Sequence, residues 1–353
     1  MERFKSFLII ILFLSLVWLA MLNWFYWSAT PFAAPVESSG DFAQDGVIDV
    51  ARPISGDYDR YRVYLGELLA VADKSAPITR RDWDAAIAGG GIYFEFLSPT
   101  PVWLVAEGLS FTKAPVFGGV MAYEMVLNED GLLVFDGRSY THFSTPLPLD
   151  LPERSGGEVA NKAIFPLADT ASRFLEEPYL SELLESLGFN PNTNFRHTQP
   201  DGQMVFVDDA RTLHINPSGR VDYHDGTSYA DEVELDERAA IRRCLSAIPG
   251  GAAFWGDGHL VFNSAAWQGD DLIFSLTYVL DGALFLDWQT VFTVESGILR
   301  NAVMHLAPAS FTDEFVRLMP KVRVETLVPQ GERVYVGYSL VEDGLWAPDW
   351  WRR

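Results

Sequence analysis

The sequence predicts an α+β protein, in which helices pack on antiparallel β-meander sheets behind a single N-terminal transmembrane helix. Two observations predict this class. The first is an uncharged apolar run at residues 7–27. The second is a helical pattern followed by several strand patterns with tight turns, an order that occurs twice in the remaining chain. Alternating strands and helices, which would indicate a parallel sheet, are not seen.

The apolar run at 7–27 is long enough to cross a bilayer. At 1.5 Å per residue it covers about 30 Å of hydrocarbon. Ser15 and Asn23 are its polar residues. A cleaved signal peptide is the alternative, but its apolar region would be shorter, and residues 28–34 place Pro and Phe where a cleavage site needs small side chains. An uncleaved anchor is therefore expected.

The flanks of this run predict its orientation. Arg3 and Lys5 precede it, and four aromatic residues at 24–27 close it. Positive flanks stay in the cytoplasm, and aromatic side chains gather at the membrane interface. We therefore expect a single-pass protein of the cell membrane with a cytoplasmic N-terminus and the bulk of the chain, 28–353, outside. A cytoplasmic tail of about six residues cannot hold a kinase or a DNA-binding module.

Charge and cysteine content restrict the partners. The chain has a formal net charge of −22. Glu2, Arg3 and Lys5 give residues 1–27 a net charge of +1, so residues 28–353 carry −22 − 1 = −23. This argues against nucleic acid and against anionic surfaces, and it allows a basic or cation-bridged partner. Cys244 is the one cysteine, so no intramolecular disulfide forms, and its helical setting predicts a core residue.

Composition divides the chain into segments. Residues 1–27 form the tail and anchor, and residues 28–45, rich in Pro, Ala, Ser and Gly, form a linker. The rest divides at breaks rich in Pro and Gly into an N-terminal α+β domain, a central helix-plus-meander domain and a C-terminal helix-plus-meander domain. These domains are expected at 46–165, 166–230 and 231–353.

The elements expected in these domains are based on periodicity and turn signals. Thr79 and Asp82 have the spacing of a helix N-cap, and Asn128-Glu129-Asp130-Gly131 is a hairpin signal. Gly188 is placed to end a helix. Helices are expected at 58–71, 79–87, 169–187 and 236–248, and strands at 92–97, 121–127, 132–136, 204–207, 212–215, 221–223, 259–267, 272–280, 288–294, 299–306 and 333–341.

No pattern in the sequence indicates an enzyme, a cofactor or a metal. Nucleophile-elbow and phosphate-loop motifs are absent. His214 and His224 fall in neighbouring expected strands and, with Asp222 or Asp225, give a weak alternative metal set. A hydrolase would need a buried pair of carboxylates in a cleft, whereas most acidic residues here fall in turns.

Trp346, Trp350 and Trp351 gather near the C-terminus. One interpretation is that this segment docks into a groove of the core. The other is a binding face, because Tyr and Trp are frequent anchors of protein interfaces. The sequence leaves both interpretations open.

Several segments, in their order, resemble proteins of the YycH/YycI family. Each segment is a weak signal alone, and their order along the chain is more specific. They are 82–87 (DWDAAI), 89–96 (GGGIYFEF) with Pro99, Pro101 and Leu104, 183–191 (LLESLGFNP), 200–207 (PDGQMVFV), 213–223 (LHINPSGRVDY), 278–282 (YVLDG) and the closing Pro348-Asp349-Trp350. They do not separate YycH from YycI.

The resemblance implies a non-enzymatic regulator of Gram-positive bacteria. Such proteins associate with a membrane histidine kinase of the WalK/YycG type, which governs cell-wall metabolism, and modulate it largely through transmembrane helix contacts. Small and polar residues favour such contacts, so Ser15, Ala20 and Asn23 are the candidates here. An anchored binding or scaffold protein for wall or secretion machinery is the alternative, and an anchored hydrolase is a third. The sequence leaves open the signal, the sign of regulation, and whether the protein acts as a homodimer or with a paralogous single-pass regulator.

Overall fold

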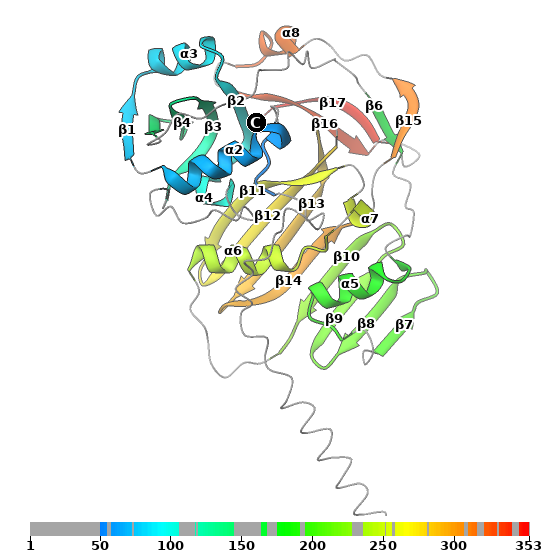
Figure 1. Cartoon of the computed structure of the whole chain (residues 1–353). Coiled ribbons are helices and arrows are strands. Elements are labelled where there is room, and N and C mark those ends of the chain that lie inside the picture. The colour runs from blue at the N-terminus through cyan, green and yellow to red at the C-terminus, as the bar shows by residue number, and fades with distance from the viewer. Residues whose placement is uncertain are drawn as a thin grey trace, which may run out of the picture. The chain divides into compact units, whose positions relative to one another are not determined.

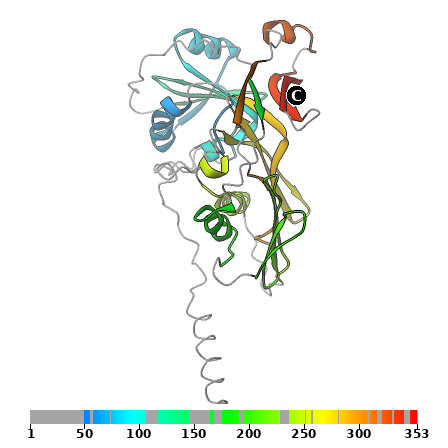
Figure 2. The same cartoon turned by 90° about the vertical axis from the view of Figure 1, so that its right-hand side faces the viewer.

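A computed structural model gives the structure of the protein (Figures 1 and 2). The structure describes residues 50–54, 58–72, 74–105, 117, 119–144, 164–167, 175–190, 195–227, 236–250, 252–255, 258–280, 282–306, 310–315, 321–329, 332–340 and 346–352. The expected anchor at 7–27, with Ser15, Ala20 and Asn23, and the expected linker at 28–45 lie outside these residues.

The described chain is an α+β structure in which strands predominate, and almost all strand pairs are antiparallel. The expected α+β class with antiparallel sheets is confirmed at this level. None of the helices in the described part is both long and apolar enough to cross a membrane.

The N-terminal part forms a five-stranded antiparallel sheet with the order β1-β5-β4-β3-β2. Its strands are β1 (Lys74–Ile78), β2 (Ile92–Pro101), β3 (Met121–Asn128), β4 (Gly131–Phe135) and β5 (Tyr140–Ser144). The helices of this part are α2 (Tyr58–Val71), α3 (Arg80–Ala88) and α4 (Val102–Val105).

Local signals in this part act as predicted. The Thr79 side chain accepts a hydrogen bond from the Asp82 amide, and the Asp82 carboxylate accepts one from the Thr79 amide, which together form a capping box at α3. The turn between Asn128 and Gly131 joins β3 to β4, and Gly131 has φ +150°. A side chain at Gly131 would meet the backbone oxygen of Phe143, so β5 can approach this turn only because the residue is a glycine.

A ten-stranded sheet forms most of the remaining fold. Its main path is β11-β12-β13-β14-β10-β9-β8-β7. The strands are β7 (Phe195–Thr198), β8 (Met204–Asp208), β9 (Arg211–Ile215), β10 (Arg220–Asp225), β11 (His259–Gln268), β12 (Asp271–Leu280), β13 (Ala283–Glu295) and β14 (Ile298–His305). Antiparallel pairing of β10 with β14 joins the meander expected in the central domain to the one expected in the C-terminal domain.

Three helices accompany this sheet: α5 (Tyr179–Ser186), α6 (Glu237–Ser246) and α7 (Ala252–Trp255). Asp236, the first residue of the helix expected over 236–248, caps α6 by accepting a hydrogen bond from the Ala239 amide. Gly188, with φ +76°, follows α5. The predicted helix over 169–187 is wrong at residues 175–178, because α5 begins only after Pro178, a residue that has no amide hydrogen for an interior helical turn.

The C-terminal strands complete the large sheet. Strand β16 (Val334–Leu340) pairs in parallel with β13 at Leu284 and Phe285, and β17 (Trp346–Arg352) pairs antiparallel with β16. A separate two-stranded sheet joins β6 (Ile164–Leu167) to β15 (Ser310–Phe315), and α8 (Lys321–Glu325) precedes β16.

One large hydrophobic core connects the two parts of the fold. It includes Phe94 and Phe143 of the N-terminal sheet, and Phe206 and Phe292 of the large sheet. Cys244 is buried in this core, as its helical setting predicts, and burial raises the pKa of its thiol.

His259, the first residue of β11, is a half-buried histidine that lies beside Arg52. Its Nδ1 lies 3.5 Å from Nη1 of Arg52. Its Nε2 is buried and has no hydrogen-bond partner in the part of the chain that the structure describes. Burial, and then the charge of Arg52, lowers the pKa of His259 to about 3.

This histidine predicts a loss of stability in acid. The unfolded chain binds a proton at His259 near pH 6.5, whereas the folded chain does so only near pH 3, so the free energy of unfolding falls with pH between these values. The slope for one such group is at most about 1.4 kcal/mol per pH unit. Between pH 7 and pH 5, the free energy of unfolding of the parent protein should fall by about 1–2 kcal/mol more than that of His259→Gln. Urea unfolding at both pH values measures this difference. His224→Gln, at an exposed position, is the matched control, and equal losses in parent and His259→Gln would contradict the prediction.

Candidate functional site: the outer face of the large sheet

The two faces of the large sheet differ. Side chains alternate between the faces of a strand. On the inner face they are buried in the core, as for Phe206, Tyr223 and Phe292. Helices α5, α6 and α7 lie on this side, and no helix of the described chain covers the other side (Figure 2). We call that other side the outer face.

Strand register aligns the side chains of the outer face in two rows that cross eight strands from β7 to β11. Residues directly opposite each other in paired strands share a face. The first row is His197, Val205, His214, Asp222, Val303, Val291, Ser275 and Ser264, and the second is Phe195, Val207, Thr212, His224, Asn301, Thr293, Ile273 and Ala266. These sixteen residues define the outer face.

The outer face is apolar and hydrogen-bonding, and it has almost no charge. Its valines and Ile273 are half-buried, and Phe195 is 66% exposed. Asp222 is the one carboxylate among these sixteen residues. Arg220, two residues earlier in β10, donates to both carboxylate oxygens of Asp222 at 2.8–3.0 Å. The face together with Arg220 is therefore neutral, on a protein whose net charge is −22.

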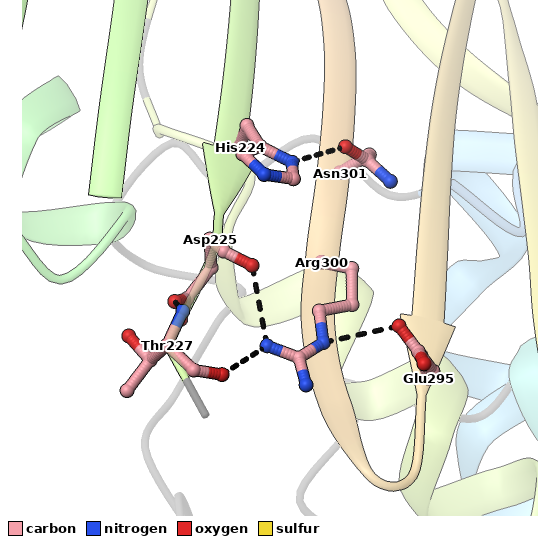
Figure 3. A network of polar contacts seen from close by, with 6 residues as sticks. All are labelled: His224, Asp225, Thr227, Glu295, Arg300 and Asn301. Atoms are coloured by element: carbon pink, nitrogen blue, oxygen red, sulfur yellow. Dashed lines mark hydrogen bonds and ion pairs between the residues drawn. The ribbon is translucent and has the colours of Figure 1, made fainter. Parts of the chain in front are cut away.

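Polar contacts fix the seam between β10 and β14 at the middle of this face. Nδ1 of His224 lies 2.9 Å from Oδ1 of Asn301 (Figure 3). Arg300 donates to the backbone oxygens of Asp225 and Thr227, at 3.2 and 2.5 Å, and to Glu295 at 3.2 Å (Figure 3). The segment after β10 is thus bound to the β13–β14 turn, and binding at this seam would require little further ordering.

The histidines of the outer face do not assemble a metal site. His214 and Asp222 lie opposite each other, but Nδ1 of His214 lies 3.3 Å from Oε1 of Gln203, and Asp222 is paired with Arg220. Asp225 points to the other face and is buried. Across the described residues, no group of three His, Cys, Asp or Glu side chains is arranged to hold a metal ion.

A pair of carboxylates lies elsewhere, at the junction between the N-terminal sheet and β16. Glu95 of β2 and Glu124 of β3 are directly opposite each other, with side chains 14% and 20% exposed. Arg333, just before β16, donates to both, at 3.3 Å to Glu95 and at shorter range to Glu124. Burial alone would lower the pKa of Arg333, but Glu124, Tyr335 and Glu95 outweigh it and raise that pKa.

This arrangement is an ion-pair joint rather than an acid–base pair. A hydrolytic pair needs one carboxylic acid ready to donate a proton and space for a sugar or a water between the groups. Here one guanidinium is ion-paired with both carboxylates and offsets part of their charge. The three residues connect two sheets that are far apart in sequence.

The three C-terminal tryptophans occupy different environments. Trp346 is 4% exposed, and its ring centroid lies 5.3 Å from those of Phe285 and Trp288 in the core. Trp350 is half-buried, and Trp351 is 40% exposed. A partner can reach Trp351 directly, whereas Trp346 is covered.

Sequence reasoning did not find the outer face. The alternation within each strand was visible, but the face exists only because β10 pairs with β14 and β7 extends the sheet, and neither pairing has a local signal.

Comparisons with known proteins give no family. No family model matches the sequence, and no curated protein matches it. The C-terminal domain of YpeB from Bacillus megaterium matches with 9% identity and a TM-score of 0.33, over 50% of this chain and 85% of that domain. A DnaN sliding clamp (DNA polymerase III subunit beta) from Bartonella birtlesii, bound to griselimycin, matches with 11% identity and a TM-score of 0.11, over 83% of this chain and 82% of the clamp. Scores at this level establish no common fold, and the resemblance to YycH and YycI is not confirmed by them.

Proposed function

We propose that the chain is a non-enzymatic, membrane-anchored extracytoplasmic regulator of a sensor histidine kinase of the cell-wall type, and that it acts through protein–protein and transmembrane-helix contacts. The observation that carries the proposal is the outer face of the large sheet. A neutral surface of half-buried β-branched and hydroxyl side chains on a strongly acidic protein is suited to contact with another protein.

Two features of the sequence support the regulatory part of the proposal. The apolar run at 7–27 has the length of one membrane-spanning helix, and such a helix can pass information inward by lateral packing against another helix. The segments within 82–104, 183–223 and 278–282, taken in their order along the chain, resemble those of the YycH/YycI family. Members of that family regulate such kinases. The carboxylate pair Glu95–Glu124, held by Arg333, gives no support to the hydrolase alternative.

The proposal predicts that one face of the anchor contacts the kinase. On a helix with 100° per residue, Ser15, Ala20 and Asn23 share one side, and Met21 faces away from their mean direction. A photoreactive residue placed at Ser15 or Ala20 in the native host should crosslink to a membrane histidine kinase or to a second single-pass regulator. The same residue at Met21 is the matched control and should give mainly lipid adducts. Adducts to wall-synthesis proteins alone would favour the scaffold alternative.

A substitution series separates regulation through the helix from simple anchoring. Packing and polar contacts between transmembrane helices contribute on the order of 0.6–2 kcal/mol. Replacing Ser15, Ala20 and Asn23 together with Leu should therefore weaken association with the kinase about tenfold and change kinase output, while the ectodomain stays folded. The control replaces three residues of the opposite side with Leu, namely Val17, Met21 and Phe25. Unchanged kinase output in the first variant would contradict control through the helix.

A further inference from the structure

We propose that the outer face of the large sheet is the contact between two copies of this chain, which associate face to face about a twofold axis. The inference does not depend on the proposed kinase, which would then contact this chain through the transmembrane helix and not through the outer face. It rests on the charge of the face, its extent and the order of its central seam.

The charge of the face suits contact with itself. In an isologous dimer the same surface patch meets itself, so it must be self-complementary. A patch with a large net charge would repel its own copy, and most of this protein carries excess negative charge. On the outer face, Asp222 is neutralised by Arg220, and the remaining side chains are apolar, hydroxyl, amide or imidazole. Two copies can meet here without opposing unpaired carboxylates.

Carboxylates lie at the edges of the face. Asp271 of β12 and Glu295 of β13 are opposite each other in the strand register, two residues beyond Ile273 and Thr293, and Asp208 and Asp209 follow Val207 of β8. Glu295 is in turn bound by Arg300 (Figure 3). A neutral centre with a charged rim is the usual anatomy of a protein interface.

The extent of the face suits a specific but moderate contact. Eight strands about 4.8 Å apart span roughly 34 Å, and the two rows with their margins cover about 14 Å along the strands. Margins at both ends bring the flat area to about 600 Å² per copy, or about 1,200 Å² for the pair, which is the lower limit of specific interfaces. Two twisted sheets can stack face to face about 10 Å apart, with their strands inclined by about 30°. A dimer with micromolar rather than nanomolar affinity is therefore expected.

The centre of the face is ordered before contact. Asn301, an exposed residue of β14, is held by His224, and Val303 lies beside it in the first row. These two positions lie at the middle of the eight strands, so in a twofold dimer each comes close to its own copy.

This symmetry provides a sharp test. A charge of either sign at Asn301 would meet the same charge from the second copy. The full chain in detergent micelles, studied by sedimentation over a concentration series, should show a monomer–dimer equilibrium. Both Asn301→Glu and Asn301→Lys should raise the dimer Kd at least about 30-fold. Val303→Glu and Val303→Lys should do the same.

The controls place the same charges away from the face. Ser75→Glu and Ser75→Lys change an exposed residue of β1 in the N-terminal sheet and should leave the Kd unchanged. A monomeric parent chain at all accessible concentrations would overturn the inference. If only one sign of charge at Asn301 weakens association, the contact is with a charged surface and not with the same face, and the inference is also wrong. Thermal unfolding of each variant distinguishes loss of contact from loss of fold.

Discussion

Replacing Arg333 with Met is expected to lower the free energy of unfolding by about 3–5 kcal/mol, because it leaves two inward-facing carboxylates opposite each other without a counter-charge. Glu95 and Glu124 are 14% and 20% exposed, and Arg333 donates to both. The guanidinium also lies 5.5 Å from the ring centroid of Tyr123. Urea unfolding of the full chain in detergent measures this loss.

Two further variants separate the charge effect from the loss of packing. Adding Glu95→Gln and Glu124→Gln to Arg333→Met removes the unpaired charges and should restore a large part of the stability. Arg352→Met breaks an ion pair with Glu332 at 3.8 Å between more exposed side chains, and such pairs contribute less than about 1 kcal/mol. If the triple variant is no more stable than Arg333→Met, the joint does not act through charge.

Local structure could be predicted from the sequence where neighbouring residues decide it. The cap formed by Thr79 and Asp82 and the Asp-Gly turn before β4 each depend on contacts within a few residues. The long strands β11 to β14 were predicted to within a few residues, except that β13 begins five residues earlier, at Ala283. Strand alternation is strong there because one face is buried in the core.

Long-range pairing could not be predicted in this way. The parallel contact of β16 with β13 involves Leu284, Phe285, Gly337 and Tyr338, and the two strands are separated by about forty residues of chain. No local sequence feature of either strand indicates the strand with which it pairs. The short strands β1, β5, β6, β7, β15 and β17 were missed. Pro77 in β1 and the exposed side chains of β7 do not resemble buried strands.

The outer face of the large sheet could not be predicted from the sequence for the same reason. His197, His214 and His224 are ten or more positions apart in sequence. Their alignment on one face of the sheet follows only from the complete strand order. Which side chains of β17 face the core could be predicted only after its pairing with β16 was known. This alternation places Trp346 in the core and Trp351 at the surface, whereas the sequence alone does not distinguish the two residues.

The two tryptophans should therefore respond differently to truncation. Trp346→Ala is expected to lower the free energy of unfolding by about 3–5 kcal/mol, the range for removing a large aromatic side chain from a core. Its ring contacts Phe285 and Trp288, and β17 has no other fully enclosed aromatic residue among its described side chains. Trp351→Ala should lose only about 1 kcal/mol, because its ring is 40% exposed and covers the backbone at Gly337 from one side.

Urea unfolding of both variants in the full chain compares these losses directly, and hydrogen exchange reports where they occur. In Trp346→Ala the amides of β16 and β17 should exchange faster than those of β3 and β4, because this aromatic cluster helps to attach the hairpin to the large sheet, with which β16 shares a short parallel contact at β13. Equal losses of stability in Trp346→Ala and Trp351→Ala would mean that the Trp351 side chain is also enclosed and is not accessible to a partner. A small loss at Trp351 with unchanged exchange in β17 leaves that side chain free for contact and assigns the attachment of the C-terminal hairpin to Trp346.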